Sequence, residues 1–433
     1  MSESVRIALL GCGVVGGAVA RRLSEAKDEF AARVGRPLEI IGVAVRDTGK
    51  DRSETGLDAS LFTTDAETLV TEADLVIELM GGMEPAKSLL QKAIESGASV
   101  ITANKALLGQ HGAELYELAE EHGVDLYYEA AVAGAIPLIR PLRVSLAGDS
   151  VHRVMGIVNG TTNFILDKMD RTGAQLADVL AEAQELGYAE ADPTADVEGH
   201  DAQAKAAILA SLAFHTRVRT CDVHVEGIMG VTADDIRAAR RIGCVIKLLA
   251  IAELVDKGGS QAVNVRVHPT LIDRSHPLAS VREAFNAVFV ETQMAGELMF
   301  YGPGAGGDPT ASAVLGDVVQ AARHKVTGGR GPGELSYANL PIEQIGASKT
   351  AYFIRLDVED KPGVLANIAK TIGEQGVSIE SMRQGVRRSQ DGLATLHLIT
   401  HRSSEADLAD VVERLKASED VREVGSVLRV EGE

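Results

Sequence analysis

The sequence predicts an α/β protein built from three folded domains. Its 433 residues are about three times the length of a typical domain of ~150 residues. Short apolar runs alternate with helical patterns over residues 1–135, which is typical of a doubly wound parallel sheet. A compact βαββαβ pattern begins at about residue 350. We therefore expect a parallel-sheet domain, a mixed α+β domain and a C-terminal βαββαβ domain.

The first expected domain covers residues 1–135. Runs of apolar and β-branched residues predict its strands, and apolar residues at helical spacing predict its helices. The strands are Val5–Leu10, Leu38–Val45, Leu75–Met80, Val100–Thr102 and Leu126–Glu129, and the helices are Val14–Ala32, Ala86–Ser96 and Ala106–His122.

The second expected domain covers residues 136–325 and mixes both kinds of element. Pro309 suits the first turn of its last helix, because proline has no N–H to satisfy there. The helices are Asn163–Arg171, Gln175–Leu186, Gly199–His215 and Asp308–His324, and the strands are His152–Val158, Val245–Glu253, Ala262–His268 and Ala287–Thr292.

A linker, residues 326–349, is expected before the third domain, residues 350–433. The density of glycine in Thr327–Glu334 marks turns. The third domain then follows the order strand, helix, strand, strand, helix, strand. These elements are Ala351–Val358, Val364–Gln375, Val377–Val386, Ala394–His401, Glu405–Lys416 and Val421–Val430.

Composition excludes several classes of protein. The 62 acidic and 43 basic residues give a net charge of −19, which disfavours nucleic acid and anionic membranes as partners. No apolar run reaches the ~18–20 residues of a membrane span, and the N-terminal residues do not resemble a signal peptide. Cys12, Cys221 and Cys244 have no spacing typical of zinc sites or disulfides. We therefore expect a cytoplasmic protein.

A glycine motif joins the first expected strand to the first helix. Gly11, Gly13 and Gly16 form G-x-G-x-x-G, with Val14 and Val15 in the variable places. The glycines permit a tight turn, close approach of a pyrophosphate and close packing of helix on strand. The helix N-terminus offers free N–H groups to the phosphates. This position predicts a Rossmann-type dinucleotide-binding domain, with a plain glycine turn as the alternative.

The end of the second expected strand bears on cofactor choice. NAD enzymes usually carry an acid there for the ribose 2′-hydroxyl, whereas Arg46 comes first in this sequence and Lys50 and Arg52 follow. A cation suits a 2′-phosphate, so NADP is favoured. Asp47 keeps NAD open, and Arg46 as a solvated loop charge is the remaining alternative.

Two lysines are placed for chemistry. Lys105 follows the strand Val100–Thr102, and ligands of open α/β sheets bind at the carboxyl ends of strands. Lys205 lies four residues after Asp201, which puts both on one helix face. The alternatives are a surface lysine for Lys105 and an exposed ion pair for Asp201 and Lys205.

Four separated motifs resemble homoserine dehydrogenases. They are Gly11–Gly16, Ile157–Leu166, the polar stretch Gly187–Lys205 and the glycine-rich Tyr301–Thr310. Residues 350–430, with the turn Asp360–Leu365, resemble an ACT regulatory domain. The resemblance covers essentially the whole chain. It implies an oxidoreductase acting on CH–OH, which interconverts L-aspartate 4-semialdehyde and L-homoserine with NAD(P) in threonine and methionine biosynthesis.

The resemblance also implies roles for single residues in the catalytic and dimerisation domain. Lys205 would donate a proton to the carbonyl oxygen, and Lys105 would lie in the site near the nicotinamide. Glu190 would bind the substrate amino group. The remaining substrate-binding residues would be Asp196, Asp201, Gly160 and Thr161.

Cofactor and metal contacts follow from the same resemblance. Gly302 and its neighbours would close over the nicotinamide end. Residues 129–137 resemble a loop that binds a monovalent cation, Na⁺ or K⁺, and an ordinary strand-to-helix connection is the alternative. The oxygens would come from Glu129, Val132, Gly134 and Ile136.

The ACT resemblance implies a regulated homodimer or homotetramer. Pro362 and Gly363 shape a turn at a helix N-terminus, where free N–H groups suit the carboxylate of an effector such as threonine. Asn367 is placed one turn later. The alternative is a domain that only dimerises.

Two other functions stay open from the residues alone. One is a dehydrogenase for another small amino or hydroxy acid, which turnover of homoserine against malate or alanine would separate. The other is an inactive amino-acid sensor, which a nicotinamide absorbance assay would detect.

Overall fold

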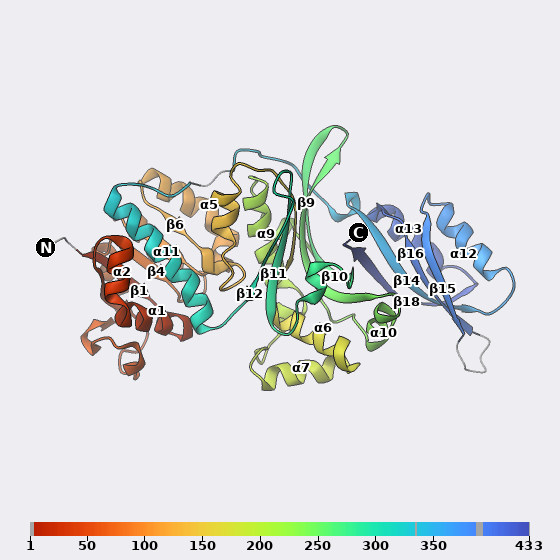
Figure 1. Ribbon diagram of the computed structural model, residues 1–433, viewed down its shortest axis with the longest axis horizontal. Helices are drawn as coiled ribbons and strands as arrows, with labels where there is room; N and C mark the ends of the chain where they lie inside the picture. The colour runs from red at the N-terminus through yellow and green to blue at the C-terminus, as the bar shows by residue number, and fades with distance from the viewer. Residues whose placement is uncertain (1–3, 334–335, 387–392, 433) are drawn as a thin grey trace. The chain divides into compact units, whose positions relative to one another are not determined.

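The computed structural model describes residues 4–333, 336–386 and 393–432 (Figure 1). The expected linker residue Glu334 and the two chain ends lie outside this range. Contacts divide the chain into two compact units, and each is described by itself. The first unit comprises Met1–Gly160, Ala204–Cys221 and Phe285–Leu340, and the second comprises Thr161–Gln203, Asp222–Ala284 and Pro341–Glu433. The expected division into three domains and a linker stays a prediction.

A six-stranded parallel sheet forms the centre of the first unit. Its strand order is β3-β2-β1-β4-β5-β6, which is the doubly wound order with a switch point between β1 and β4. The expected α/β class is therefore confirmed. The strands are β1 (Val5–Leu10), β2 (Leu38–Ala44), β3 (Phe62–Thr63), β4 (Leu75–Glu78), β5 (Ser99–Thr102) and β6 (Leu126–Tyr127).

Helices cover this sheet, and apolar side chains of three of them share one core with β1 and β4. These three are α1 (Val14–Glu25), α2 (Lys27–Val34) and α11 (Gly307–Thr327), and the others are α3 (Ala66–Glu72), α4 (Ala86–Glu95) and α5 (Lys105–Glu121). The single helix expected over Val14–Ala32 is wrong, because the helix breaks at Ala26. Figure 1 shows α11 running beside α1 and α2.

A short antiparallel sheet completes the first unit, in the order β12-β11-β7. Its strands are β7 (Val151–Ile157), β11 (Phe285–Thr292) and β12 (Glu297–Pro303). The last of these lies outside the expected strands. After α11, the glycine-rich segment is tied down, since Gly331 donates its N–H to Asp125 Oδ1 at 2.9 Å.

The second unit contains a long hairpin and several helices. Strands β9 (Cys244–Lys257) and β10 (Ser260–Asp273) pair antiparallel along their whole length. The short strand β8 (His224–Val225) pairs with β10, and so does β13 (Ile342–Glu343). The helices are α6 (Gly160–Thr172), α7 (Leu176–Glu185), α8 (Thr194–Val197), α9 (His200–Ala213) and α10 (Ala233–Arg241). Helices α6 and α9 cross the division between the units.

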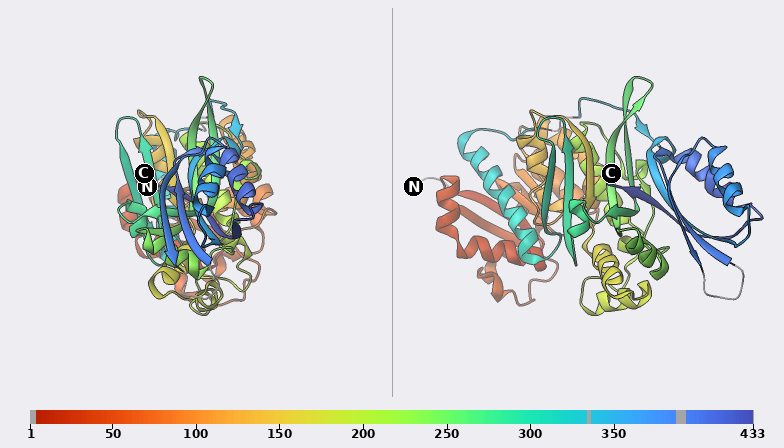
Figure 2. Two further views of the ribbon diagram at one scale, coloured as in Figure 1. Left: turned by 90° about the vertical axis from the view of Figure 1, so that its right-hand side faces the viewer. Right: turned by 45° about the vertical axis from the view of Figure 1, so that its right-hand side comes forward.

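The C-terminal sheet of the second unit, in the order β18-β14-β16-β15, has the expected βαββαβ connectivity. Helices α12 and α13 pack on one of its faces (Figure 2). Strand β18 also pairs with β10 through Leu271↔Val430 and its neighbours. The elements are β14 (Lys349–Glu359), α12 (Val364–Gly373), β15 (Ile379–Val386), β16 (Leu393–Thr400), β17 (Ser403–Ser404), α13 (Glu405–Lys416) and β18 (Val421–Glu431). Among the described residues, no helix is long and apolar enough to cross a membrane.

Candidate active site

The glycine motif forms a bare cradle at the switch point of the parallel sheet. A Cβ at Gly11 would lie 2.8 Å from the carbonyl oxygen of Leu79, and one at Gly16 would lie 2.2 Å from that of Gly11. Gly13 caps α1 without any side-chain hydrogen bond, and a Cβ there would meet nothing within 4 Å. The first N–H groups of α1 therefore face open space, as a pyrophosphate requires. Val14 is 80% exposed beside this space and Val15 is half-buried.

The loop after β2 presents three cations. Arg46 and Lys50 are exposed. Arg52 is held by the carbonyl oxygens of Asp47 at 2.9 Å and Lys50 at 3.1 Å, and its guanidinium lies over the ring of Phe62. The positive charge of Arg52 lies near Cys12 in the glycine motif, and burial raises the pKa of that thiol. The cations of this loop thus lie next to the cradle, with Arg52 beside Cys12.

A buried network places Lys105 at the start of α5. The carboxylate of Glu78 accepts the N–H groups of Met80 and Gly81 and the hydroxyl of Thr102, the last at 2.6 Å. Asn104 caps α5 by accepting the Leu107 N–H. These contacts fix the ends of β4 and β5, so Lys105 begins its helix at the carboxyl edge of the sheet. Sequence reasoning missed Glu78, whose only signal was a single acid within the apolar run Leu75–Met80.

The loop of residues 129–137 is closed by its own glutamate. The buried carboxylate of Glu129 accepts the N–H groups of Leu138 at 2.6 Å, Ile139 at 2.7 Å and Arg140 at 3.0 Å. Among the described residues, no hydrogen bond ends on the carbonyl oxygens of Val132, Gly134 or Ile136. A cation in this loop would therefore be bound by backbone carbonyl oxygens, while the Glu129 side chain shapes the loop.

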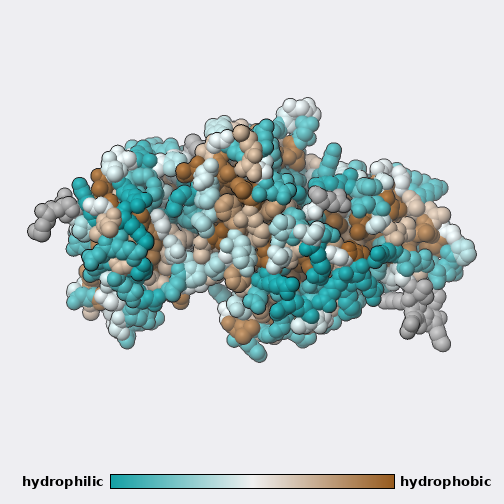
Figure 3. Space-filling model, in the orientation of Figure 1, coloured by the Kyte–Doolittle hydropathy of each residue, from teal (hydrophilic) through white to brown (hydrophobic). Residues whose placement is uncertain are grey.

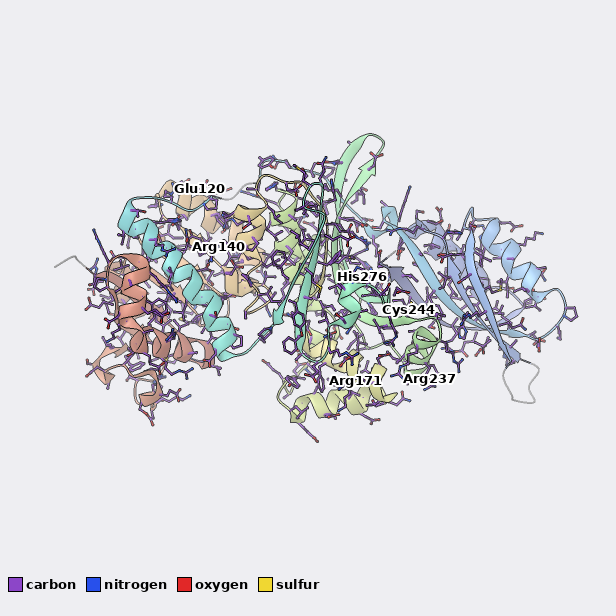
Figure 4. The ribbon with its side chains drawn as sticks, in the orientation of Figure 1. Glu120, Arg140, Arg171, Arg237, Cys244 and His276 are labelled. Carbon is purple, nitrogen blue, oxygen red and sulfur yellow. The ribbon has the colours of Figure 1, made fainter. Side chains whose placement is uncertain are left out.

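An acid from α11 lies behind this loop. Asp317 Oδ2 accepts the N–H of Glu129 at 2.8 Å, and Asp317 Oδ1 accepts from Arg140 at 2.7 Å. Burial, assisted by the negative charge of Glu129, raises the pKa of Asp317 to about 7 despite those two donors. Arg140 is labelled next to α11 in Figure 4. Asp317 was not anticipated, because an aspartate within a helix carries no signal of burial.

The loop of residues 129–137 packs against the glycine-rich stretch Tyr301–Thr310. A Cβ at Gly134 would lie 2.3 Å from the carbonyl oxygen of Gly304, and one at Gly302 would lie 3.2 Å from Ile136. A Cβ at Gly307 would lie 2.9 Å from Val14. The expected nicotinamide segment, cation loop and phosphate cradle are thereby neighbours.

Lys205 is 9% exposed, on α9. Its Nζ donates a hydrogen bond to the carbonyl oxygen of Val158 at 2.7 Å. Val158 immediately follows β7, two residues before Gly160, so this contact fixes the ammonium at the end of β7. Asp201, also buried, is one turn earlier on the same helix face.

The other expected substrate residues lie in the second unit. Thr161 donates its hydroxyl to the carbonyl oxygen of Tyr188 at 2.6 Å. The backbone of Glu190 is held by Gln184 at 3.1 Å, while its side chain is exposed and has no ion pair within the described range. Asp196 is half-buried in the short helix α8.

Each unit thus gathers a part of the predicted set. The first unit holds the cradle, Lys105, the cation loop and Lys205, and the second holds Thr161, Glu190, Asp196 and Asp201. Within residues 4–333, 336–386 and 393–432, no group of three or more His, Cys, Asp or Glu side chains is arranged to bind a metal ion.

Family comparisons match three segments of the chain. The model described as homoserine dehydrogenase matches residues 137–319. The homoserine dehydrogenase NAD binding domain matches residues 11–129, and the ACT domain matches residues 352–420.

Relatives are similar over nearly the whole length. The homoserine dehydrogenase of Corynebacterium glutamicum is 57% identical over 430 residues, which is 99% of this chain and 96% of that protein. The crystal structure of the Thiobacillus denitrificans homoserine dehydrogenase superposes with a TM-score of 0.91 at 38% identity and covers 99% of both chains. A hyperthermophilic archaeal homoserine dehydrogenase in complex with NADPH has a TM-score of 0.63 at 28% identity, covering 77% of this chain and 100% of that one.

Proposed function

Because the chain belongs to the homoserine dehydrogenase family, we propose that Lys205 is the proton donor and acceptor of its reaction. The reaction itself is the NAD(P)-dependent interconversion of L-aspartate 4-semialdehyde and L-homoserine, a step toward threonine and methionine. The observation that carries the proposal is a buried ammonium fixed at 2.7 Å from the Val158 carbonyl, at the head of the substrate motif.

The bound nicotinamide supplies or takes up the hydride. The protein must then supply a proton to the carbonyl oxygen, which gains negative charge as the aldehyde is reduced. Lys205 gives its proton to that oxygen, and in the reverse direction it takes the hydroxyl proton of homoserine. General acid–base catalysis of this kind contributes about 10²–10⁴-fold. Lys105, at the carboxyl edge of the sheet, is the second cation of the site and the alternative donor.

Orientation of the substrate falls to the acidic residues of the second unit. The exposed carboxylate of Glu190 has no ionic partner in the described residues and is available to an ammonium. Asp196 and Asp201 add negative charge to the same stretch of chain. Holding the α-ammonium positions the aldehyde for transfer, which is the entropic part of catalysis. Gly160 and Thr161 line the pocket.

The cofactor is held by the cradle Gly11–Gly16 and by the loop after β2. The open N-terminus of α1 fits a pyrophosphate, and Arg46 with Arg52 fits a 2′-phosphate, so we favour NADP over NAD. The archaeal relative is described with NADPH, which is compatible with this choice. Gly302 covers the nicotinamide end.

A monovalent cation fits the loop of residues 129–137. Its oxygens would be the backbone carbonyls of Glu129, Val132, Gly134 and Ile136, a set without net charge that suits Na⁺ or K⁺. The ion would stiffen a loop that packs on Gly302 and Gly304. Activity measured with each alkali chloride, at constant ionic strength, tests this assignment.

Regulation and assembly are assigned to the ACT domain. The N-terminus of α12 has Gly363 as its cap with no side-chain hydrogen bond, so its N–H groups suit the carboxylate of threonine. Asn367 is committed to Asp420 at 2.8 Å and would have to exchange that partner to help. Strand β15 ends the C-terminal sheet, and its outer edge suits pairing with a second copy, which supports a homodimer or homotetramer.

Steady-state kinetics tests the substrate and effector assignments together. We expect turnover of homoserine with NADP to exceed turnover with NAD, and malate and alanine to give none. Threonine at millimolar concentration should inhibit. Absence of a threonine response would overturn the regulatory assignment and leave the catalytic one intact.

A further inference from the structure

A cavity of about 300 Å³ lies in the second unit, between α10 and the C-terminal sheet. Side chains alternate between the two faces of a strand. In β14, Ile354 and Leu356 point into the core under α12 and α13, so Phe353 and Arg355 point to the opposite face. The same alternation in β16 places Thr395 and His397 on that face. Helix α10 packs there and leaves the cavity beside it.

The walls of this cavity are cationic. Arg237 and Arg241 come from α10, and Arg355 and His397 come from the sheet. Arg241 has no hydrogen-bond or ion-pair partner for its guanidinium among the described residues. Arg355 binds Ser426 through Nε at 3.3 Å, and its two terminal nitrogens have no partner in the described part of the chain. Donors are therefore in excess of acceptors.

Three neighbouring carboxylates equal the arginines in number, but they leave the Arg241 guanidinium and the terminal nitrogens of Arg355 without a partner among the described residues. Asp234 lines the cavity and pairs with Arg237. Asp235 Oδ1 lies 3.9 Å from Arg355 Nε, and Asp235 Oδ2 accepts the hydroxyl of Thr232 in the capping box of α10. Asp357 is buried on the same face as Arg355, opposite Thr395 on β16, and accepts the Thr395 hydroxyl at 2.7 Å. Burial, together with Arg241 and Arg355, lowers the pKa of His397, so a neutral imidazole adds one more N–H donor.

We propose that this cavity binds a small dianionic oxyanion, such as a phosphate group or a dicarboxylate, between α10 and the C-terminal sheet. Guanidinium groups match such oxygens in a bidentate geometry. A zwitterionic amino acid fits less well, because its ammonium would meet three arginines. The hydrophilic surface around α10 is visible in Figure 3, and Arg237 is labelled in Figure 4. The bound anion would join α10 to the regulatory sheet.

Calorimetric titration of the full-length protein, saturated with NADP, tests this site. The probes are inorganic phosphate and succinate, with ionic strength held by potassium chloride. We expect saturable binding of at least one probe, with one site per chain. Arg241→Gln should weaken it by about tenfold or more, because one charge-assisted contact is lost. Arg414→Gln, an exposed arginine on the far side of the sheet, should bind like the parent.

The two probes identify the ligand. Tighter binding of phosphate indicates a phosphate ester, and tighter binding of succinate indicates a dicarboxylate. Either result supports the site if Arg241→Gln weakens it. No saturable binding of either probe, or equal binding by the parent and Arg241→Gln, would overturn the proposal. Because Arg241 is exposed at the end of α10, its variant should fold, and the melting curve without probe checks this.

Discussion

At the residue scale, buried polar side chains hold the loops of the candidate site. Glu78 and Glu129 are carboxylates that accept backbone N–H groups where strands end. Lys205 acts in the opposite sense, as a donor, because its ammonium donates a hydrogen bond to the backbone carbonyl of Val158. An unsatisfied buried polar group costs about 1–3 kcal/mol. Any other arrangement of these loops would leave a buried polar group without its partner. The loops therefore keep one conformation, which holds the side chains of the candidate site in place.

Replacing the exposed carboxylate Glu190 tests ammonium recognition. Glu190→Gln should raise KM for homoserine by about 10–100-fold and change kcat less, because the ammonium does not react. Steady-state kinetics with homoserine and NADP measures both constants. Glu185→Gln, an exposed glutamate at the end of α7, is the matched control. An unchanged KM would remove Glu190 from the amino-group site.

Cofactor choice is tested at Arg46. Arg46→Ala should weaken NADP by about 10–100-fold, the effect of losing one charge-assisted contact. Binding of NAD should change little, because it lacks the 2′-phosphate. Fluorescence titration with NADPH and NADH gives the two affinities. Equal losses for both cofactors would transfer the role to Lys50 or to Arg52, which the structure places beside Cys12.

At the element scale, the loop of residues 129–140 depends on an acid from a distant helix. Asp317 in α11 holds the Glu129 N–H and the Arg140 guanidinium. Its folded pKa of about 7 is higher than the ~3.9 of an unfolded aspartate. Between these two pH values Asp317 holds a proton in the folded chain and has lost it in the unfolded chain. The contribution of Asp317 to the free energy of unfolding is therefore fully present below about pH 4 and is lost as pH rises through about 7.

Asp317→Asn removes this pH dependence. Asparagine can still accept the Glu129 N–H but cannot ionise. Between pH 5 and pH 7 the free energy of unfolding of the parent should fall relative to that of the variant. The difference should change by at most ~1.4 kcal/mol per pH unit. Urea denaturation at several pH values measures the difference. Parallel curves for the two proteins would show that Asp317 ionises normally.

Sequence reasoning predicted the elements that have strong periodicity or a motif. Strand β1, the cradle at Gly11 and helix α13 were all anticipated, because alternation, glycine placement and amphipathic spacing are local signals. The break at Ala26 and helix α10 were not, since Ala26 carries no helix-breaking signal and polar residues dominate α10. Glu78 and Asp317 were missed because burial of an acid is decided by tertiary packing.

On the scale of the whole molecule, the C-terminal sheet is built into the second unit. Strand β18 pairs with β10, and Arg429 binds Glu226 through two contacts of 2.8 Å. Arg266 in β10 is fully buried and pairs with Glu253 at 2.7 Å and Glu431 at 2.8 Å. Removing the ACT domain would leave this arginine without one of its partners. Truncation near Ala347 is therefore a poorer test of regulation than substitution within α12.

The pair Arg266–Glu431 makes this connection measurable. Glu431→Gln leaves a buried guanidinium short of negative charge and should cost about 3–5 kcal/mol of unfolding free energy. Glu413→Gln, at an exposed position of α13, is the control and should change it by less than ~0.5 kcal/mol. Chemical denaturation of both variants decides. Equal stability of the two would mean that the C-terminal strand is not anchored by this pair.

Lys205 remains the centre of the account, and one measurement tests it most directly. The turnover number of Lys205→Ala is measured with homoserine and NADP, beside Lys105→Ala, with cofactor affinity followed by NADPH fluorescence. We predict that kcat falls by about 10²–10⁴-fold in Lys205→Ala while the affinity for NADPH is retained. A kcat within tenfold of the parent, for protein that is fully folded, would contradict the assignment and place the proton transfer on Lys105 or on water.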